Sequence, residues 1–239
     1  MSELCFRAKR APSQWLAGLV LLLALRVSTV ESALPARAVA RFGDHRFIHT
    51  ARLASLAFSP DGTALFATAL NEACLWEVAT GKKQRRFAGD SFLCGALSPD
   101  GRTVALAHNG SLIEVFDAAS GELRAQLTGA RNRSWAVTLS PDGREAASGD
   151  GREVILWNVP KAEELRRWQP PGENVAAVQF SPDGRRLAIA TAGTNGCVRI
   201  EHLDSGGAPV QLAGGTGFQP WLVFSPRREI CRRILRCPI

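Results

Sequence analysis

Short apolar runs recur along the chain at a nearly constant spacing. Each run of five or six mostly apolar residues ends at the tetrapeptide Ser-Pro-Asp-Gly, and a second run of apolar or small residues follows it. The four copies begin at Ser59, Ser98, Ser140 and Ser181, so their starts are 39, 42 and 41 residues apart. Proline presets φ at the first central position of a turn, and glycine adopts the positive φ that returns the chain. Each copy therefore predicts a hairpin that joins two strands.

Alignment on these turns predicts four short strands in each repeat and no helix. The run before the turn is the first strand and the run after it is the second, and further turns separate the third strand from the fourth. The expected strands are residues 53–58, 64–69, 73–78 and 83–87, then 92–97, 103–108, 112–117 and 123–127, then 134–139, 145–149, 153–158 and 164–168, and finally 175–180, 186–191, 197–202 and 209–213. A repeat of about 40 residues built from short strands is typical of a propeller blade or another stacked array.

The carboxylates and glycines of the four turns recur at equal places in the repeats. This regularity indicates a structural role in hairpins and argues against a pair of carboxylates that act as general acid and base. The residues assigned to this role are Asp61, Gly62, Asp100, Gly101, Asp142, Gly143, Asp183 and Gly184.

The ends of the third predicted strands share a second motif. It reads Leu75-Trp76-Glu77-Val78, Val115-Phe116-Asp117, Leu156-Trp157-Asn158-Val159 and, more weakly, Arg199-Ile200-Glu201-His202. With four turns and four strand ends in register, residues 40–226 resemble the WD-repeat (WD40) β-propeller family. The resemblance implies an all-β fold of radially arranged, four-stranded blades. It also implies that Trp76, Phe116, Trp157 and Ile200 belong to the blade cores.

The resemblance also implies where the blades begin and end. Four complete blades are expected at about 49–88, 89–128, 129–169 and 170–213 within residues 33–226, and residues 214–226 are expected to begin a fifth. The expected fold is therefore an incomplete or open propeller. Residues 227–239 form a basic tail that fits no blade, so a truncated, non-functional fragment of a longer WD40 protein is one alternative.

The chain departs from the family at its polar network. The family implies a Gly-His pair before each inner strand, whose His joins a turn Asp, a Ser or Thr, and the Trp. Here Gly89-Asp90, Gly129-Ala130 and Gly172-Glu173 stand in place of that pair. The turn Asp is present only as Asp150, and Asn71, Asn109 and Asn195 are assigned to the equivalent places. We expect strand pairing and apolar packing to hold most blades together.

The first 32 residues predict an export signal. Basic Arg7, Lys9 and Arg10 precede an apolar segment, residues 15–25, whose eleven residues are fewer than the roughly 20 that span a bilayer. The chain is therefore expected in the periplasm or outside the cell, and a membrane anchor formed by residues 15–25 is the alternative. The alanine-, arginine- and glycine-rich blades resemble bacterial WD-repeat proteins with such signals.

Charge and composition exclude several function classes. The net charge is +7, but residues 33–226 hold 20 basic and 19 acidic groups, which argues against a nucleic-acid surface. The four histidines, His45, His49, His108 and His202, form no nucleophile constellation, and the sequence has no GxSxG motif and no phosphate-binding loop. No catalytic, cofactor-binding or metal-binding residue is therefore assigned, and no cofactor is expected.

Cysteines and paired arginines leave two points open. Cys74, Cys94 and Cys197 lie in predicted strands, where they are expected as buried apolar side chains, and a Cys74–Cys94 disulfide is the alternative. Two segments combine arginine with tryptophan, Arg131 and Arg133 beside Trp135, and Arg166-Arg167-Trp168. They are expected either as exposed cation–π contacts or as solvated blade rims.

A non-catalytic protein-interaction scaffold is the function that these observations favour. The residues that begin the inner strands, Leu53, Phe92, Ser134 and Val175, are poor material for catalysis. An exported ligand-binding or enzymatic propeller is the alternative. The expected partners are other proteins, including a second copy that completes the propeller as a homodimer, and neither nucleic acid nor any membrane beyond the N-terminal signal.

Overall fold

The computed structural model describes residues 52–89, 91–204, 206–213, 222 and 224. The chain divides into two units, residues 1–38 and 39–239, and every described residue belongs to the second. The predicted signal, the basic tail and most of the predicted fifth inner strand lie outside the described residues. Within them, no helix is long and apolar enough to cross a membrane.

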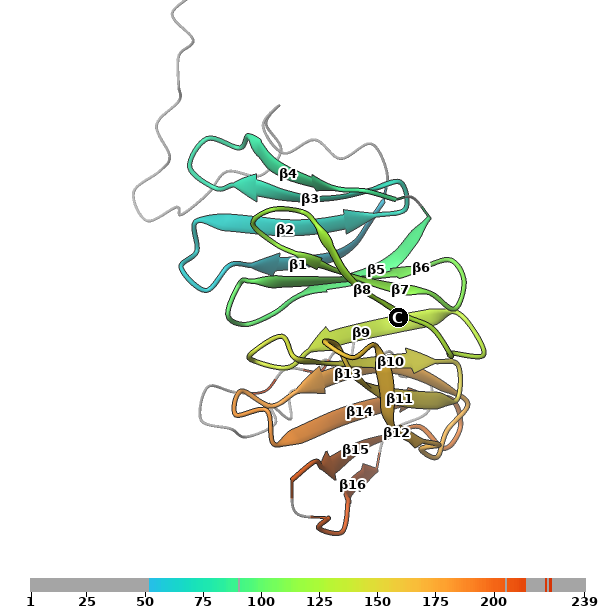
Figure 1. The fold of residues 1–239 in the computed structure, drawn as a ribbon. Helices are drawn as coiled ribbons and strands as arrows, with labels where there is room; N and C mark the ends of the chain where they lie inside the picture. The colour runs from blue at the N-terminus through green and yellow to red at the C-terminus, as the bar shows by residue number, and fades with distance from the viewer. Residues whose placement is uncertain (1–51, 90, 205, 214–221, 223, 225–239) are drawn as a thin grey trace, which may run out of the picture. The chain divides into compact units, whose positions relative to one another are not determined.

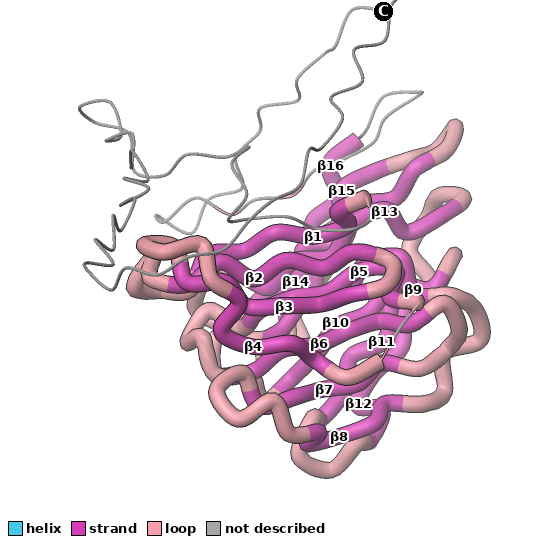
Figure 2. The backbone as a smooth tube through the Cα atoms, turned by 90° about the horizontal axis from the view of Figure 1, so that it is seen from above, coloured by secondary structure: helices cyan, strands magenta, loops and turns pink. Residues whose placement is uncertain are grey.

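The described residues form sixteen strands in four antiparallel sheets, which confirms the all-β prediction (Figures 1 and 2). The strands follow each other within each sheet, joined by turns. The first sheet contains β1 (Leu53–Phe58), β2 (Ala64–Ala69), β3 (Glu72–Glu77) and β4 (Lys83–Phe87), and the second contains β5 (Phe92–Leu97), β6 (Thr103–His108), β7 (Ile113–Asp117) and β8 (Leu123–Leu127). The third contains β9 (Ser134–Leu139), β10 (Glu145–Asp150), β11 (Glu153–Asn158) and β12 (Glu163–Trp168), and the fourth contains β13 (Asn174–Phe180), β14 (Arg186–Ala192), β15 (Cys197–His202) and β16 (Val210–Ala213).

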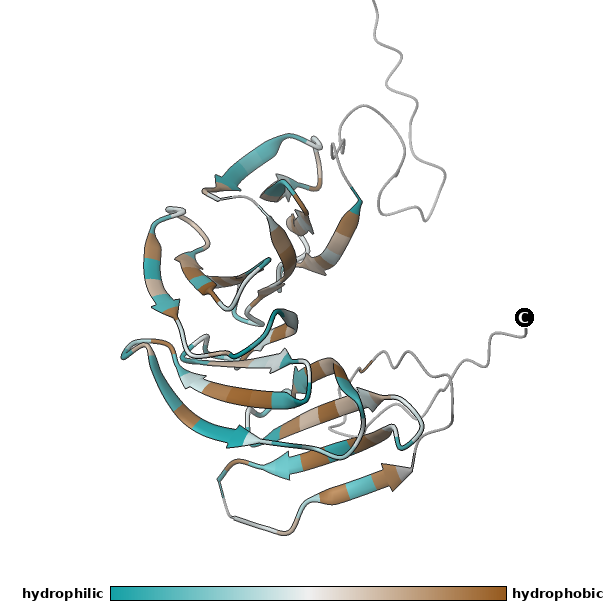
Figure 3. Ribbon diagram, turned by 90° about the vertical axis from the view of Figure 1, so that its right-hand side faces the viewer, coloured by the Kyte–Doolittle hydropathy of each residue, from teal (hydrophilic) through white to brown (hydrophobic). Residues whose placement is uncertain are grey.

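The first strands of successive sheets lie next to one another. Strand β1 contacts β5, β5 contacts β9 and β9 contacts β13. The sheets follow one another along an arc (Figure 3), as expected for the blades of an open propeller.

The Ser-Pro-Asp-Gly turns are closed by the same hydrogen bonds in all four sheets. The serine hydroxyl donates to the aspartate Oδ1 at 2.5 to 2.7 Å, and the glycine N–H donates to the serine carbonyl at 2.8 to 2.9 Å. The glycines have φ between +67° and +74°. In the first turn, the Ser59 hydroxyl is the main reason that the pKa of Asp61 falls from its ordinary value of 3.8 to about 2. These turns therefore hold their shape through the same bonds to an aspartate carboxylate.

Acidification is therefore expected to weaken the fold. A carboxyl group whose pKa is lower in the folded state stabilises that state fully above its unfolded pKa, and this contribution is lost as pH falls through the folded value. For Asp61 the window lies between 3.8 and about 2. Urea unfolding followed by tryptophan fluorescence should show a lower midpoint at pH 3 than at pH 6. The urea midpoint of the Asp61→Asn variant should fall less than that of the parent between pH 6 and pH 3. Equal decreases in the two midpoints would contradict this role for Asp61.

Buried apolar side chains of neighbouring sheets pack against each other in three clusters, and Figure 3 shows the hydrophobic segments along the strands. The first interface contains Phe66, Phe87 and Phe116, with ring centroids 5.6 to 6.2 Å apart along the series. The second contains Ile155 and Trp157, and the third contains Val178 and Phe180. The residues assigned from the sequence to the blade cores, Trp76, Phe116, Trp157 and Ile200, are all buried.

The strand register corrects the position assigned to Ile200. Trp157 pairs with Ala146, the third residue after its turn glycine, and Trp76 and Phe116 have the equivalent partners. In the fourth sheet the third residue after the turn glycine is Leu187, and Leu187 pairs with Glu201. Ile200 pairs with Ala188 and lies on the opposite face. The connection between β14 and β15 sets Leu187 and its partner further apart in the sequence than the equivalent pairs of the other sheets, so the residue at the tryptophan position is Glu201 and not Ile200. Glu201 is buried and forms an ion pair with Arg199.

The alternative of a Cys74–Cys94 disulfide is wrong. Both thiols are free and buried, and burial is the main cause that raises the pKa of each to about 12. Cys74 packs with Leu65 and Trp76, whereas Cys94 lies in the interface with the third sheet, where its Sγ is 3.6 Å from the Ser134 carbonyl. Cys74 lies on the face of the first sheet away from the second, and Cys94 lies on the face of the second sheet that packs on the third, so the two thiols point away from each other.

The first sheet carries exposed apolar side chains on one face. Leu56 and Phe58 of β1 are more than half exposed, at 57% and 54%. By strand register, Leu56 and Phe58 occupy the positions that Val178 and Phe180 occupy in the fourth sheet. Val178 and Phe180 are buried against the preceding sheet. The exposed face of β1 therefore has the composition of a sheet interface.

Candidate binding groove at the third sheet

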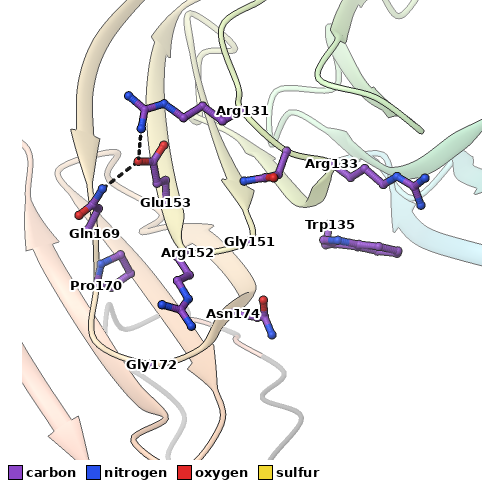
Figure 4. Close-up of a pocket in the computed structure, with 11 residues that line it drawn as sticks. Arg131, Arg133, Trp135, Gly151, Arg152, Glu153, Gln169, Pro170, Gly172 and Asn174 are labelled. Atoms are coloured by element: carbon purple, nitrogen blue, oxygen red, sulfur yellow. Dashed lines mark hydrogen bonds and ion pairs between the residues drawn. The ribbon is translucent and has the colours of Figure 1, made fainter.

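A groove of about 940 Å³ lies at one end of the third sheet (Figure 4). Three connections surround it: residues 129–133 between β8 and β9, the turn at 151–152 between β10 and β11, and residues 169–173 between β12 and β13. Its polar and aromatic lining includes Arg131, Arg133, Trp135, Arg152, Glu153 and Asn174. The groove therefore brings together side chains from segments that are separate in the sequence.

Asp150 ties two of these connections together. Its carboxylate is fully buried, and Oδ2 accepts hydrogen bonds from the backbone N–H groups of Arg131 at 2.7 Å and Asn132 at 3.1 Å. Its other oxygen, Oδ1, has no hydrogen-bond partner among the described residues. A buried carboxylate that accepts backbone bonds fixes the loop that donates them. Asp150 thus positions Arg131 and Asn132 beside the β10–β11 turn.

The register also corrects the residues assigned as equivalents of Asp150. Asp150 is the seventh residue after its turn glycine and pairs with Ser134, the first residue of β9. The same register positions in the other sheets are Ala69, His108 and Thr191, and not Asn71, Asn109 and Asn195. Thr191 has a related role, since its hydroxyl donates to the Pro171 carbonyl at 2.7 Å. The asparagines follow the strand in each hairpin connection, which is why similarity of residue type misassigned them.

A β-bulge exposes Trp135. Ser134 pairs with Asp150 and Ala136 with Gly149, so Trp135 is the extra residue with no partner on β10. A bulge of this kind redirects a side chain out of the normal alternation, and the indole is 56% exposed. The same bulge occurs in the other three inner strands. The sequence showed the Arg-Trp segment, but only strand pairing shows that the ring lies in the groove.

Positive charge dominates the groove. Glu153 is buried, and its carboxylate accepts hydrogen bonds from Gln169 at 2.8 Å and from Arg167 at 2.5 Å, while Arg131 lies 3.6 Å away. The Gln169 amide, followed by Arg167, lowers the pKa of Glu153. Arg133 and Arg152 are exposed and form no ion pair with any residue that the structure describes. Figure 4 shows Arg133 beside Trp135, away from the Arg131–Glu153–Gln169 cluster.

The second arginine–tryptophan segment is arranged differently. The Arg166 guanidinium lies 5.4 Å from the centroid of the Trp168 ring, a cation–π contact. Arg167 instead pairs with Glu153 and Glu164. No cation–π contact joins Trp135 to a described arginine. The indole of Trp135 is therefore open to another molecule.

The turn residues lie at the opposite ends of the strands from the groove. Asp142, Asp183 and Lys161 line a second pocket of about 810 Å³ there, and Asp100, Asp142 and Arg124 line a third of about 370 Å³. His108 lies 2.8 Å from Glu114 in the second sheet. Across the described ranges, no group of three His, Cys, Asp or Glu residues is placed to hold a metal ion.

Comparisons with known proteins identify the repeat. The family model described as "WD domain, G-beta repeat" matches residues 163–200. This segment runs from β12, the last strand of the third sheet, into β15 of the fourth. The matched repeat is therefore offset by one strand from the sheet and spans two neighbouring sheets.

Curated relatives carry the same kind of repeat. Human WD repeat-containing protein 3 is 24% identical over 169 residues, which are 66% of this chain and 18% of that protein. Drosophila melanogaster groucho is 32% identical over 114 residues, which are 46% of this chain and 15% of groucho. The chain thus matches less than a fifth of the length of each of these relatives.

Solved structures share the fold. The structure of U3-55K has a TM-score of 0.60 and 23% identity, covering 70% of this chain and 53% of that one. Hydrazine synthase of Kuenenia stuttgartiensis has a TM-score of 0.66 and 18% identity, covering 79% of this chain and 56% of that one. At this level of identity the likeness shows the fold alone. The matched repeat, the relatives and the four-sheet architecture together support the WD40 repeat family for this chain.

Proposed function

We propose that this protein is a non-catalytic scaffold that binds other proteins through the groove at the third sheet. The observation that carries the proposal is the exposed Trp135 in one groove with Arg133 and Arg152, two arginines that form no ion pair with any described residue. Tryptophan and arginine are the residue types most enriched at the energetic centres of protein interfaces. The similarity of this chain to WD-repeat relatives is consistent with a protein-binding role.

The described residues of the groove offer poor material for catalysis. The carboxylate that lines it, Glu153, is engaged by Arg167 and Gln169, so its lowered pKa suits an ion pair and not a general acid or base. Among the described residues that line the groove there is no serine, cysteine, histidine or lysine. The enzymatic alternative therefore gains no support from this groove.

Crosslinking of the tagged full-length chain in cells, followed by mass spectrometry, tests the proposal. The test variant combines Arg133→Gln, Trp135→Ala and Arg152→Gln. A matched control combines Arg52→Gln and Leu93→Ala. Arg52 is the equivalent of Arg133 in the first sheet, and Leu93 is the equivalent of Trp135 in the second. We expect a set of partner proteins with the parent and the control, and at least a tenfold loss with the groove variant. Equal recovery with the groove variant, or no specific partner with the parent, would overturn the proposal.

Two further predictions from the sequence stay predictions. Export directed by residues 1–32 concerns a segment outside the described residues. A homodimer that completes the propeller would cover Leu56 and Phe58, the exposed apolar side chains of β1.

A further inference from the structure

We propose that the groove recognises an extended acidic segment of a partner protein. Arg133 and Arg152 bind its carboxylates, and Trp135 packs against an apolar side chain next to them. This inference rests on the proposed scaffold function and specifies the chemistry of the partner.

The other sheets show that these three side chains are not needed to build a blade. The strand register shows which residue stands in the equivalent position of each of the other sheets. The equivalents of Trp135 are Ala54, Leu93 and Ala176, those of Arg133 are Arg52, Ser91 and Asn174, and those of Arg152 are Asn71, Gly110 and Gly193. The same bulge forms around an alanine in two sheets. The combination of two arginines and a tryptophan therefore serves something other than the fold.

Charge pairing distinguishes the arginines of the groove. Arg131 and Arg167 both lie within ion-pair distance of Glu153, and Arg167 also pairs with Glu164, so two carboxylates compensate these two cations within the sheet. Arg133 and Arg152 have no such partner among the residues described. A guanidinium group matches a carboxylate with two parallel hydrogen bonds, and this planar geometry favours arginine over lysine for recognising acids. The uncompensated charge of the groove thus selects for anionic ligands.

Trp135 makes the groove more than a basic surface. An exposed indole offers a large, rigid contact area at low cost in side-chain entropy, and it becomes an energetic centre when a partner covers it. Asp150 holds the adjoining loop in place through its bonds to Arg131 and Asn132. The binding surface is therefore largely formed before a partner arrives, which lowers the entropic cost of association.

The size of the groove favours a peptide segment over a small anion. A volume of about 940 Å³ is near the upper end of the range for ligand sites, about 300 to 1,000 Å³. Asn174 adds an amide group to the lining that matches the backbone of an extended chain. A single carboxylate or phosphate would leave most of this surface uncovered.

Selection from a display library of random ten-residue peptides on the full-length protein tests the inference. We expect enrichment of peptides that combine Asp or Glu with an apolar residue. An enriched peptide, dye-labelled and measured by fluorescence anisotropy in low salt, should bind at least tenfold more tightly than its Asp→Asn and Glu→Gln counterpart. Trp135→Ala and the Arg133→Gln/Arg152→Gln pair should each weaken binding at least tenfold. Arg52→Gln and Leu93→Ala should leave it unchanged, and circular dichroism checks that every variant is folded.

Several outcomes would overturn the inference. Enrichment of neutral or basic peptides, equal binding of the amide counterpart, or equal binding by the groove variants would each show that the groove does not read carboxylates. Tight binding only when phosphoserine replaces the acidic residues would assign the groove to phosphorylated segments instead. If crosslinked partners depend on the groove while acidic peptides fail to bind, the scaffold function stands and this inference alone fails.

Discussion

Replacing Gly143 by valine is expected to lower the free energy of unfolding by about 2–5 kcal/mol. Gly143 has φ of +67°, a conformation that strains a β-branched residue. A Cβ atom there would also lie 2.5 Å from Thr103 Oγ1 and 2.9 Å from Thr103 Cβ. Thr103 begins β6, is buried, and is bound by Arg124 at 3.2 Å, so it has little room to move. Guanidinium chloride unfolding followed by circular dichroism measures the change.

Gly62→Val is the matched control for this substitution. Gly62 occupies the same place in the first turn with φ of +70°, but a Cβ atom there would meet nothing within 4 Å. Gly62→Val should therefore lower the free energy of unfolding only by the cost of the backbone strain, about 1–2 kcal/mol. The difference between the two variants measures the contact between the third turn and the second sheet. An unchanged unfolding midpoint for Gly143→Val would show that the hairpin is assigned wrongly.

Replacing Trp157 by alanine is expected to cost about 3–5 kcal/mol. Trp157 is 1% exposed and packs in the interface between the second and third sheets. Its Nε1 also donates to the buried Ser148 hydroxyl at 2.9 Å. The cavity left by the ring would remain between two sheets whose strands are held by their own hydrogen bonds. Chemical unfolding of parent and variant gives the value, and a loss below about 1 kcal/mol would contradict the burial of this ring.

Trp157→Phe separates the hydrogen bond from the apolar packing. Phenylalanine keeps most of the buried area but leaves the Ser148 hydroxyl without its donor, so a smaller loss of about 1–3 kcal/mol is expected. In a cycle with Ser148→Ala, the double variant should lose less than the two single variants together. Strict additivity would show that the bond contributes nothing to stability.

Local features could be predicted from the sequence where the controlling interactions lie within a few residues. The Ser-Pro-Asp-Gly turns close through bonds between residues at most five positions apart, so four hairpins and the strands beside them follow from the residues alone. The predicted ranges agree with β1, β2 and their counterparts because each apolar run ends at such a turn. The apolar residues of these strands then bury themselves between sheets.

Register was harder to predict than strand position. Alignment of the third-strand ends places Ile200 at the tryptophan position, but the longer β14–β15 connection places Glu201 opposite Leu187. A shift by one residue moves a side chain to the other face of a sheet, because strand side chains alternate. The same limit explains the misassigned equivalents of Asp150. The expectation that Cys74 and Cys94 are buried apolar side chains is confirmed, and the alternative of a disulfide between them is wrong.

The repeat, the hairpins and the near-neutral charge of the blade region follow from the amino-acid sequence alone, since these depend on neighbouring residues and on composition. Which face each residue occupies and which loops meet depend on how the strands pair in the folded chain. Arg133 and Arg152 are 19 positions apart, and the pairing of β9 with β10 brings their loops to one groove, where a bulge turns Trp135 outward. Such a site arises from hydrogen bonds between distant segments, and that is the physical reason why a linear motif did not reveal it.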